Sequence, residues 1–404
     1  MHTQSDHAET FYPLSVFATD AVRGGELPMW LPYSFGGVPV MELGLTGLLY
    51  PPRLAAMLVF SPIRQHDFLL VTHVLGAGLA MYALLRLWGA SAAGAVLGAI
   101  AWEASGHNAF WLTVEHVALV AAWLPVMLAT ATIAIRKLSF GWSAAAAGAL
   151  SMAVMAGNAH YAYLSGLALA SFFGISAITC ATRSFRRGET RRALRALLLP
   201  AVSLLLAAAL TAGYWLPLAG WLGNIHRQPV SLGAQLSGAI SLEALGRAMI
   251  RPSRVFGLTL PGSDFSGFAF TGLPAAVLAL ASIFRRSTVV LFGFLLAGFS
   301  LSVALGFATV VSLLRSLLPF IGTMHLHAFL YLSCFGIAAL GAMGATELAE
   351  RLVRWRAGSM LGPLVILVFV GFEARQVISV FRQVNPRHPV TQQWLFPRTD
   401  LIQN

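Results

Sequence analysis

The feature that most constrains this chain is a set of long apolar runs that contain no charged side chain. Residues 289–311, for example, include no Asp, Glu, Lys or Arg. Of the 404 residues, 57% are hydrophobic and 10% are charged, whereas soluble domains carry about 25% charged residues. The runs are continuous, and strands of a membrane barrel would instead alternate apolar and polar residues. The sequence therefore predicts an all-α polytopic membrane protein and excludes a soluble enzyme.

Runs of about 17 or more apolar residues predict ten transmembrane helices. The second and fourth of these runs are short and rich in Ala and Gly. The ten predicted spans cover residues 67–85, 91–106, 116–135, 140–157, 160–181, 197–219, 268–284, 288–311, 326–349 and 358–378.

The positions of Lys and Arg predict the orientation of these spans. The chain has 26 Lys and Arg against 15 Asp and Glu, and 14 of the 26 lie in only 34 loop positions, which ten spans place on one side. By the positive-inside rule that side is cytoplasmic, so both termini lie outside. In a membrane protein this surplus indicates topology and contact with anionic membrane lipids, not a nucleic-acid partner. The loops in question are 86–90, 136–139, 183–196, 285–287 and 350–357.

Five segments follow from this topology. We expect a further helix upstream of the sequence, because the first 66 residues would otherwise have to cross the membrane without a helix to lead them. The segments are a long first extracytoplasmic loop at 1–66, helices one to six at 67–219, an extracytoplasmic loop at 220–267, helices seven to ten at 268–378, and an extracytoplasmic tail at 379–404.

The first loop contains the most informative motif of the chain. Prolines make this segment rigid, a Gly-Gly pair permits a tight turn, and the aromatic side chains suit the headgroup layer. A short apolar stretch at 54–60 predicts either a helix that lies in the interface or a buried helix of the loop. The alternative interpretation is that the loop has no catalytic role and only packs on the helix bundle as a lid. Its motif residues are Trp30, Pro32, Tyr33, Gly36, Gly37, Pro39, Tyr50 and Pro51.

Residues 6–52 resemble the first outer loop of the YfhO family of bacterial membrane proteins. That family has an Asp, then a Pro, then a pattern close to G-x-L-P-L-W-N-P-Y-x-F-x-G-x-P, then F-Y-P. Leu31 stands where the family has Asn, and residues 324–327 read Met-His-Leu-His where it tends to have basic residues around a proline. The resemblance does not extend to the first helix and the C-terminal outer domain of the family.

The resemblance implies a GT-C-like fold and a glycosyltransferase of the bacterial cytoplasmic membrane, with its active side extracytoplasmic. Such an enzyme moves a sugar from a polyprenyl-phosphate donor to a glycan or lipid acceptor. Asp6 matches the first-loop acid that acts as catalytic base, and Glu9 is a candidate second acid. Cations at the outer interface would hold the donor phosphate, and the candidates are Arg53, Arg64, His325 and His327.

Two pairs of carboxylate and imidazole side chains are candidate ligands for a divalent cation such as Mg²⁺ or Mn²⁺. Glu103 lies four residues before His107, and Glu115 directly precedes His116. Their spacing does not distinguish a metal site from hydrogen bonds that orient neighbouring helices, so no cofactor is assigned.

The sequence leaves two other classes of function open. One is a flippase or transporter for a lipid-linked glycan, which would place ionisable residues or broken helices near the membrane midplane. Five predicted spans contain no Asp, Glu, Lys or Arg, which argues against an ion-coupled carrier. The other is a non-catalytic accessory membrane protein.

The predicted orientation can be tested by cysteine labelling in intact cells, in a variant without the two native cysteines. Cysteines at Ser34 and Gly262 are expected to react with a membrane-impermeant thiol reagent. A cysteine at Gly188 is expected not to react, because its loop is the most basic of the chain. Labelling at position 188 would reverse the orientation and place the outward-facing residues in the cytoplasm.

Overall fold

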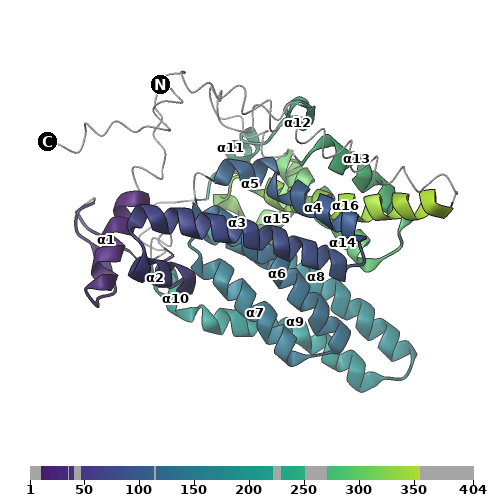
Figure 1. The fold of residues 1–404 in the computed structure, drawn as a ribbon, viewed down its shortest axis with the longest axis horizontal. Helices are drawn as coiled ribbons and strands as arrows, with labels where there is room; N and C mark the ends of the chain where they lie inside the picture. Colours follow the sequence, from purple (N-terminus) through teal and green to yellow (C-terminus); the bar gives the residue numbers. More distant parts are fainter. Residues whose placement is uncertain are drawn as a thin grey trace.

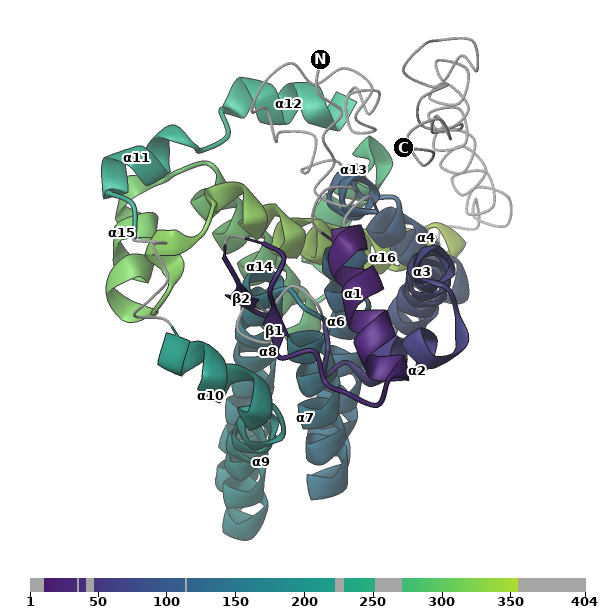
Figure 2. The same ribbon diagram turned by 90° about the vertical axis from the view of Figure 1, so that its left-hand side faces the viewer.

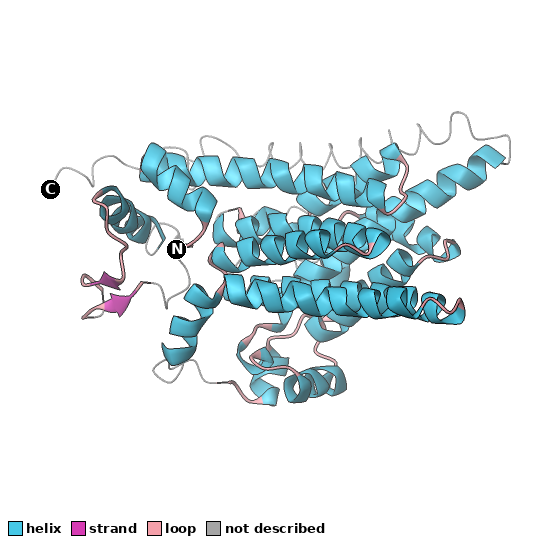
Figure 3. Cartoon of the chain, turned by 90° about the horizontal axis from the view of Figure 1, so that it is seen from below, coloured by secondary structure: helices cyan, strands magenta, loops and turns pink. Residues whose placement is uncertain are grey.

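A computed structural model describes residues 11–34, 36–40, 47–112, 115–221, 229–250 and 271–354. These residues form an all-α protein whose long helices run side by side, with one small β-hairpin near one end of the bundle (Figures 1 and 3). The predicted span 358–378, the tail 379–404 and much of the loop 220–267 lie outside the described residues.

Among the described residues, five helical segments are long and apolar enough to cross a membrane, as predicted for a membrane-embedded all-α protein. The helices that provide them are α3 (Pro62–Leu87), α6 (Glu115–Lys137), α8 (Ala159–Arg186), α9 (Thr190–Leu210) and α16 (Leu330–Arg354), the last together with the preceding turn η7 (Leu326–Phe329).

The described residues do not confirm ten spans. Three of the predicted spans correspond to apolar helices of at most 17 residues, which are short for a bilayer core about 30 Å thick. They are α4 (Ala92–Glu103), α7 (Phe140–Met155) and α13 (Leu273–Ala281) with its extension η5 (Ser282–Phe284). The predicted span 197–219 is likewise divided, because α9 ends at Leu210 and α10 (Ala212–Trp221) follows as a separate helix.

The run 288–311, predicted as one span, forms two helices at an angle of 104°. They are α14 (Thr288–Ala304) and α15 (Ala308–Leu317). Gly306 follows α14 with a left-handed backbone conformation, at φ +70°, which ends the helix. A Cβ at this position would also contact Ala239. Hydrophobicity could not reveal this break, because residues on both sides of Gly306 are equally apolar.

Close helix packing around α16 organises one half of the bundle. α16 contacts α13, α14 and α4 extensively, and Figure 2 shows it next to these helices in the upper part of the molecule. Glycines permit the approach: a Cβ at Gly341 would lie 2.9 Å from the carbonyl oxygen of Ala275, and one at Gly344 would collide with that of Leu278. Small residues play this role in membrane helix pairs generally.

The first-loop elements lie together at one end of α3 (Figure 1). They are α1 (Tyr12–Arg23), the strands β1 (Trp30–Leu31) and β2 (Val38–Pro39), and α2 (Pro51–Val59). The strands pair antiparallel, with Trp30 opposite Pro39. Gly37, at φ +111°, lies directly against the Trp30 ring, so a side chain there would displace it. The Trp, Pro and Gly residues of the motif thus build a hairpin, and the short helix predicted over 54–60 is present as α2.

The remaining elements are short. α5 (Gly106–Trp111) joins α4 to α6, and α11 (Leu232–Ser237) packs near the turn η6 (Ile321–Thr323) through Gln235, whose side-chain amide donates to Ile321 O at 2.7 Å. Arg315 donates to the side-chain oxygen of the same glutamine, also at 2.7 Å. α12 (Leu242–Ile250) follows α11.

Gly344→Ala is expected to destabilise the protein, whereas Gly174→Ala is expected to be neutral or stabilising. The new methyl group of the first would collide with the Leu278 carbonyl oxygen, and overpacking costs about 1–3 kcal/mol. Gly174 in α8 has open space at its Cβ position, so only the better helix propensity of Ala, about 1 kcal/mol, remains. Melting temperatures in detergent would measure both, and equal shifts would contradict this packing.

Candidate functional site

The candidate site begins at the first turn of α2. Pro51 and Pro52 open this helix, which suits proline because the first helical N–H groups have no intrahelical partner. The next residue, Arg53, is only 4% exposed. Gly47, at φ +56°, lets the backbone pass close to the guanidinium, since a Cβ there would lie 3.1 Å from Arg53 Nε. The sequence therefore presents Arg53 to the bundle and not to solvent.

Arg53 meets Glu115, 62 residues later in the chain. One guanidinium nitrogen of Arg53 donates to Glu115 Oε1, and His66 Nδ1 lies 2.8 Å from Glu115 Oε2. The side chains of Arg53 and Glu115 are 5% and 7% exposed, and that of His66 is 20% exposed. These three residues, Arg53, His66 and Glu115, form what we call the Glu115 cluster.

Two physical effects hold this buried carboxylate. Glu115 is the first residue of α6, where the helix dipole favours a negative charge. Its two oxygens also have separate partners, a guanidinium and an imidazole, which offset the cost of removing the charge from water. The cluster therefore ties α2, α3 and α6 together at one point.

A second chain of hydrogen bonds starts at Tyr50, the residue that precedes α2. Trp123 Nε1 donates to the Tyr50 hydroxyl at 2.8 Å, and that hydroxyl also bonds to His73 Nε2. His73 Nδ1 faces the carbonyl oxygen of Leu69 at 2.7 Å. Because a carbonyl only accepts, Nδ1 carries the imidazole proton, and Nε2 accepts the Tyr50 proton. Burial raises the pKa of Tyr50 to about 12, so it remains a donor.

Helix α1 covers this cluster. Arg23 donates to the carbonyl oxygens of Met57 and Phe60 at 2.9 and 2.8 Å, and Thr19 is hydrogen-bonded to Gln65. At the other end of α1, the rings of Phe11 and His116 are 4.5 Å apart. A small cavity remains between α1 and the cluster, lined by Phe11, Leu14, Ser15, Ala18, Arg53, Met57, Glu115 and His116.

The residues predicted for catalysis and donor binding have different positions. Asp6 and Glu9 lie outside the described residues. Arg53 is buried and paired with Glu115, whereas the sequence suggested an exposed cation at the interface. Arg64, in the first turn of α3, is exposed. His325 is exposed and stacks on the buried His327 with 5.2 Å between ring centroids.

The candidate metal ligands do not gather into a site. Glu115 binds Arg53 and His66, and His107 packs against the rings of Tyr161 and Tyr331 at 4.9 and 5.0 Å. Within the described ranges, no group of three or more His, Cys, Asp or Glu side chains could hold a metal ion. The geometry of Glu115 instead matches the alternative that the sequence left open, a side chain that orients neighbouring helices.

Sequence reasoning did not assign His66 and Trp123 to the site, and it placed His73 only among the histidines at the ends of the spans. The two histidines are seven residues apart on α3, two helical turns, so they share a face with the buried Leu69. Trp123 lies eight residues after Glu115 on α6, which also gives these two residues a common face. This periodicity was a usable signal, but it does not reveal that the face meets α2.

The chain matches no protein-family model, no curated protein and no solved structure. The family resemblance of residues 6–52 therefore stays a prediction, and the site geometry carries the functional argument.

Removal of one partner of the buried ion pair is expected to destabilise the protein strongly. Arg53→Met leaves Glu115 without its guanidinium, and loss of one partner of a buried pair costs about 3–5 kcal/mol. The double variant Arg53→Met, Glu115→Leu removes both charges and is expected to recover most of that loss. Melting temperatures in detergent would measure all variants, with Arg64→Met as the exposed control. Additive losses in the double variant would show that the pair does not couple.

Proposed function

We propose that the protein is a membrane-embedded glycosyltransferase that takes a sugar from a polyprenyl-phosphate donor on the extracytoplasmic side. The observation that carries this proposal is the attachment of the first loop to the helix ends. Tyr50 from that loop bonds to His73 and Trp123, and Arg53 bonds to Glu115, which also bonds to His66. Helix α1 covers a small cavity beside Arg53 and Glu115. These contacts support the proposal, because they fix the motif that resembles GT-C enzymes against buried polar side chains at the helix ends.

Asp6 would act as the general base in this reaction. Its carboxylate would remove the proton from an acceptor hydroxyl while the hydroxyl oxygen forms a bond to the anomeric carbon. The bond between that carbon and the donor phosphate oxygen breaks, and the polyprenyl phosphate leaves with its negative charge. Phe11, two residues after Glu9 in sequence, contacts His116.

The cations divide into two roles. Arg53 is already paired with Glu115, so it positions the first loop and the carboxylate. Arg64 is exposed at the same end of α3, and it is the better candidate to contact the leaving phosphate. His325 is also exposed and remains a candidate. We assign no step to a divalent cation, because the described side chains provide no ligand group for one.

One observation favours the alternative of a flippase or transporter for a lipid-linked glycan. The break between α14 and α15 is the kind of discontinuous helix that transporters use near a binding site. However, neither helix carries a charged residue within ten residues of the break except Arg315, which is bonded to Gln235 and to the carbonyl oxygen of Val230. The first-loop site therefore supports the enzyme more directly.

Asp6→Asn is expected to lower sugar transfer by about 10²–10⁴-fold, the usual contribution of general-base catalysis. Glu9→Gln is expected to cost less. The assay uses membranes, a polyprenyl-phosphate sugar and an acceptor, with any upstream helix present. Asp67→Asn is the matched control, because Asp67 is an exposed acid on α3.

Full turnover by the Asp6→Asn variant would show that Asp6 is not the catalytic base. A wild-type protein that is folded and correctly oriented but transfers no sugar would favour the accessory or carrier alternative. Transport of a lipid-linked glycan across reconstituted vesicles would then distinguish these two.

A further inference from the structure

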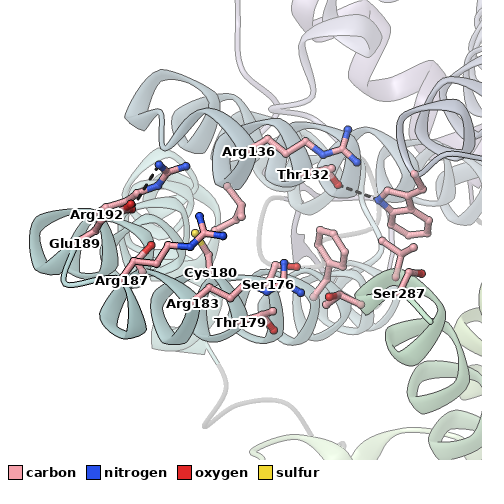
Figure 4. Close-up of a pocket in the computed structure, with 16 residues that line it drawn as sticks. Thr132, Arg136, Ser176, Thr179, Cys180, Arg183, Arg187, Glu189, Arg192 and Ser287 are labelled. Atoms are coloured by element: carbon pink, nitrogen blue, oxygen red, sulfur yellow. Dashed lines mark hydrogen bonds and ion pairs between the residues drawn. The ribbon is translucent and has the colours of Figure 1, made fainter.

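We propose that a cavity at the arginine-rich end of the bundle binds the phosphate headgroup of an anionic phospholipid. The cavity has a volume of about 470 Å³ and lies among the ends of α6, α8, α9 and α14 (Figure 4). This site does not depend on the proposed transferase function.

The cavity lies at the opposite end of the bundle from the Glu115 cluster. Glu115 and Arg136 are the first and next-to-last residues of α6, and the 21 helical steps from one to the other rise about 30 Å. That distance matches the hydrocarbon thickness of a bilayer. Arg136 also donates to the carbonyl oxygen of Leu87 at the end of α3, at 2.7 Å. The two sites are therefore separated by about one membrane thickness, and the cavity is on the predicted cytoplasmic side.

Positive charge dominates the cavity wall. Four arginines and one glutamate line it, and the glutamate, Glu189, is 3.6 Å from Arg192. Arg183 and Arg187 are four residues apart at the end of α8, so their like charges share one helix face and repel. In the part of the chain that the structure describes, neither has a hydrogen-bond or ion-pair partner. An anion between them would relieve this repulsion.

Backbone and hydroxyl donors add to the arginines. Ser287, Thr288 and Val289 from the start of α14 line the cavity, and the 17-residue α14 directs the positive end of its dipole there. Ser176 on α8 contributes a hydroxyl group, whereas the hydroxyl of Thr179 already donates to the carbonyl oxygen of Ile175 at 2.7 Å. A phosphate group, with several acceptor oxygens, matches this set of donors.

The deeper wall indicates a lipid and not a free phosphate. Trp88 and Phe172 line the cavity with their rings 5.5 Å apart, and Trp88 Nε1 is already bonded to Thr132 at 3.0 Å. Outside the cavity, α8 and α14 expose Ile178 and Leu291, which are 61% and 54% exposed. A phospholipid can place its phosphate on the arginines and its acyl chains along such apolar helix faces.

The test is a titration of the delipidated full chain in detergent, with binding measured by native mass spectrometry. Phosphatidylglycerol is the probe, and phosphatidylcholine and inorganic phosphate are the comparison ligands. The double variant Arg183→Gln, Arg187→Gln is expected to weaken phosphatidylglycerol binding roughly thirtyfold, because each arginine near an anionic headgroup contributes about a factor of five.

The matched control is Arg191→Gln, Arg195→Gln on α9. These arginines have the same four-residue spacing and lie near the same end of the bundle, but they do not line the cavity. Affinity in this control is expected to stay within about twofold of wild type. Ser176→Phe keeps every arginine and fills the cavity, so it is expected to weaken binding without a change in charge.

Three results would overturn the proposal. Equal binding of phosphatidylglycerol and phosphatidylcholine would remove the preference for an anionic headgroup. Equal losses of phosphatidylglycerol affinity in the two double variants would show that general surface charge, and not this cavity, causes the effect. Displacement of phosphatidylglycerol by an equal concentration of inorganic phosphate would make the site one for free phosphate.

Discussion

The buried ion pair between Arg53 and Glu115 is the interaction on which the end of the bundle that carries the first loop depends. It joins the first loop to α6, and through His66 it also joins α3. A charge pair at 5% and 7% exposure is costly to desolvate, so it is stable only while both partners remain in place. The pair therefore helps to hold the loop in one defined position on the bundle, together with buried apolar side chains such as Leu14, Val40 and Met57.

The same pair gives the first-loop motif a physical meaning. The Pro-Pro start of α2 and the positive φ of Gly47 direct Arg53 inward, and Tyr50 is fixed by Trp123 and His73. Helix α1 then packs on α2 and α3, with Arg23 bonded to the end of α2. A motif that resembles a catalytic loop is thus built as an ordered cover over a polar site, which suits both a lid and an enzyme.

The two ends of the bundle differ in charge because the membrane separates two environments. At one end, a carboxylate compensates a single buried arginine. At the other, four arginines meet one glutamate around an open cavity. Uncompensated positive charge is favourable next to anionic lipid. The positive-inside pattern and the cavity are therefore two consequences of one arginine distribution, the first visible in the sequence and the second only in the fold.

The sequence by itself determined the class of this protein, because apolar runs without charge leave a helical membrane protein as the consistent solution. It also located the short helix of the first loop and the basic end of the bundle. It did not determine where the helix after Thr288 ends, since Gly306 breaks it within a continuous apolar run. Nor could it pair Arg53 with Glu115 or join Tyr50 to His73. Hydrophobicity decides which segments are buried, but ion pairs and hydrogen bonds between distant residues exist only once the helices are packed.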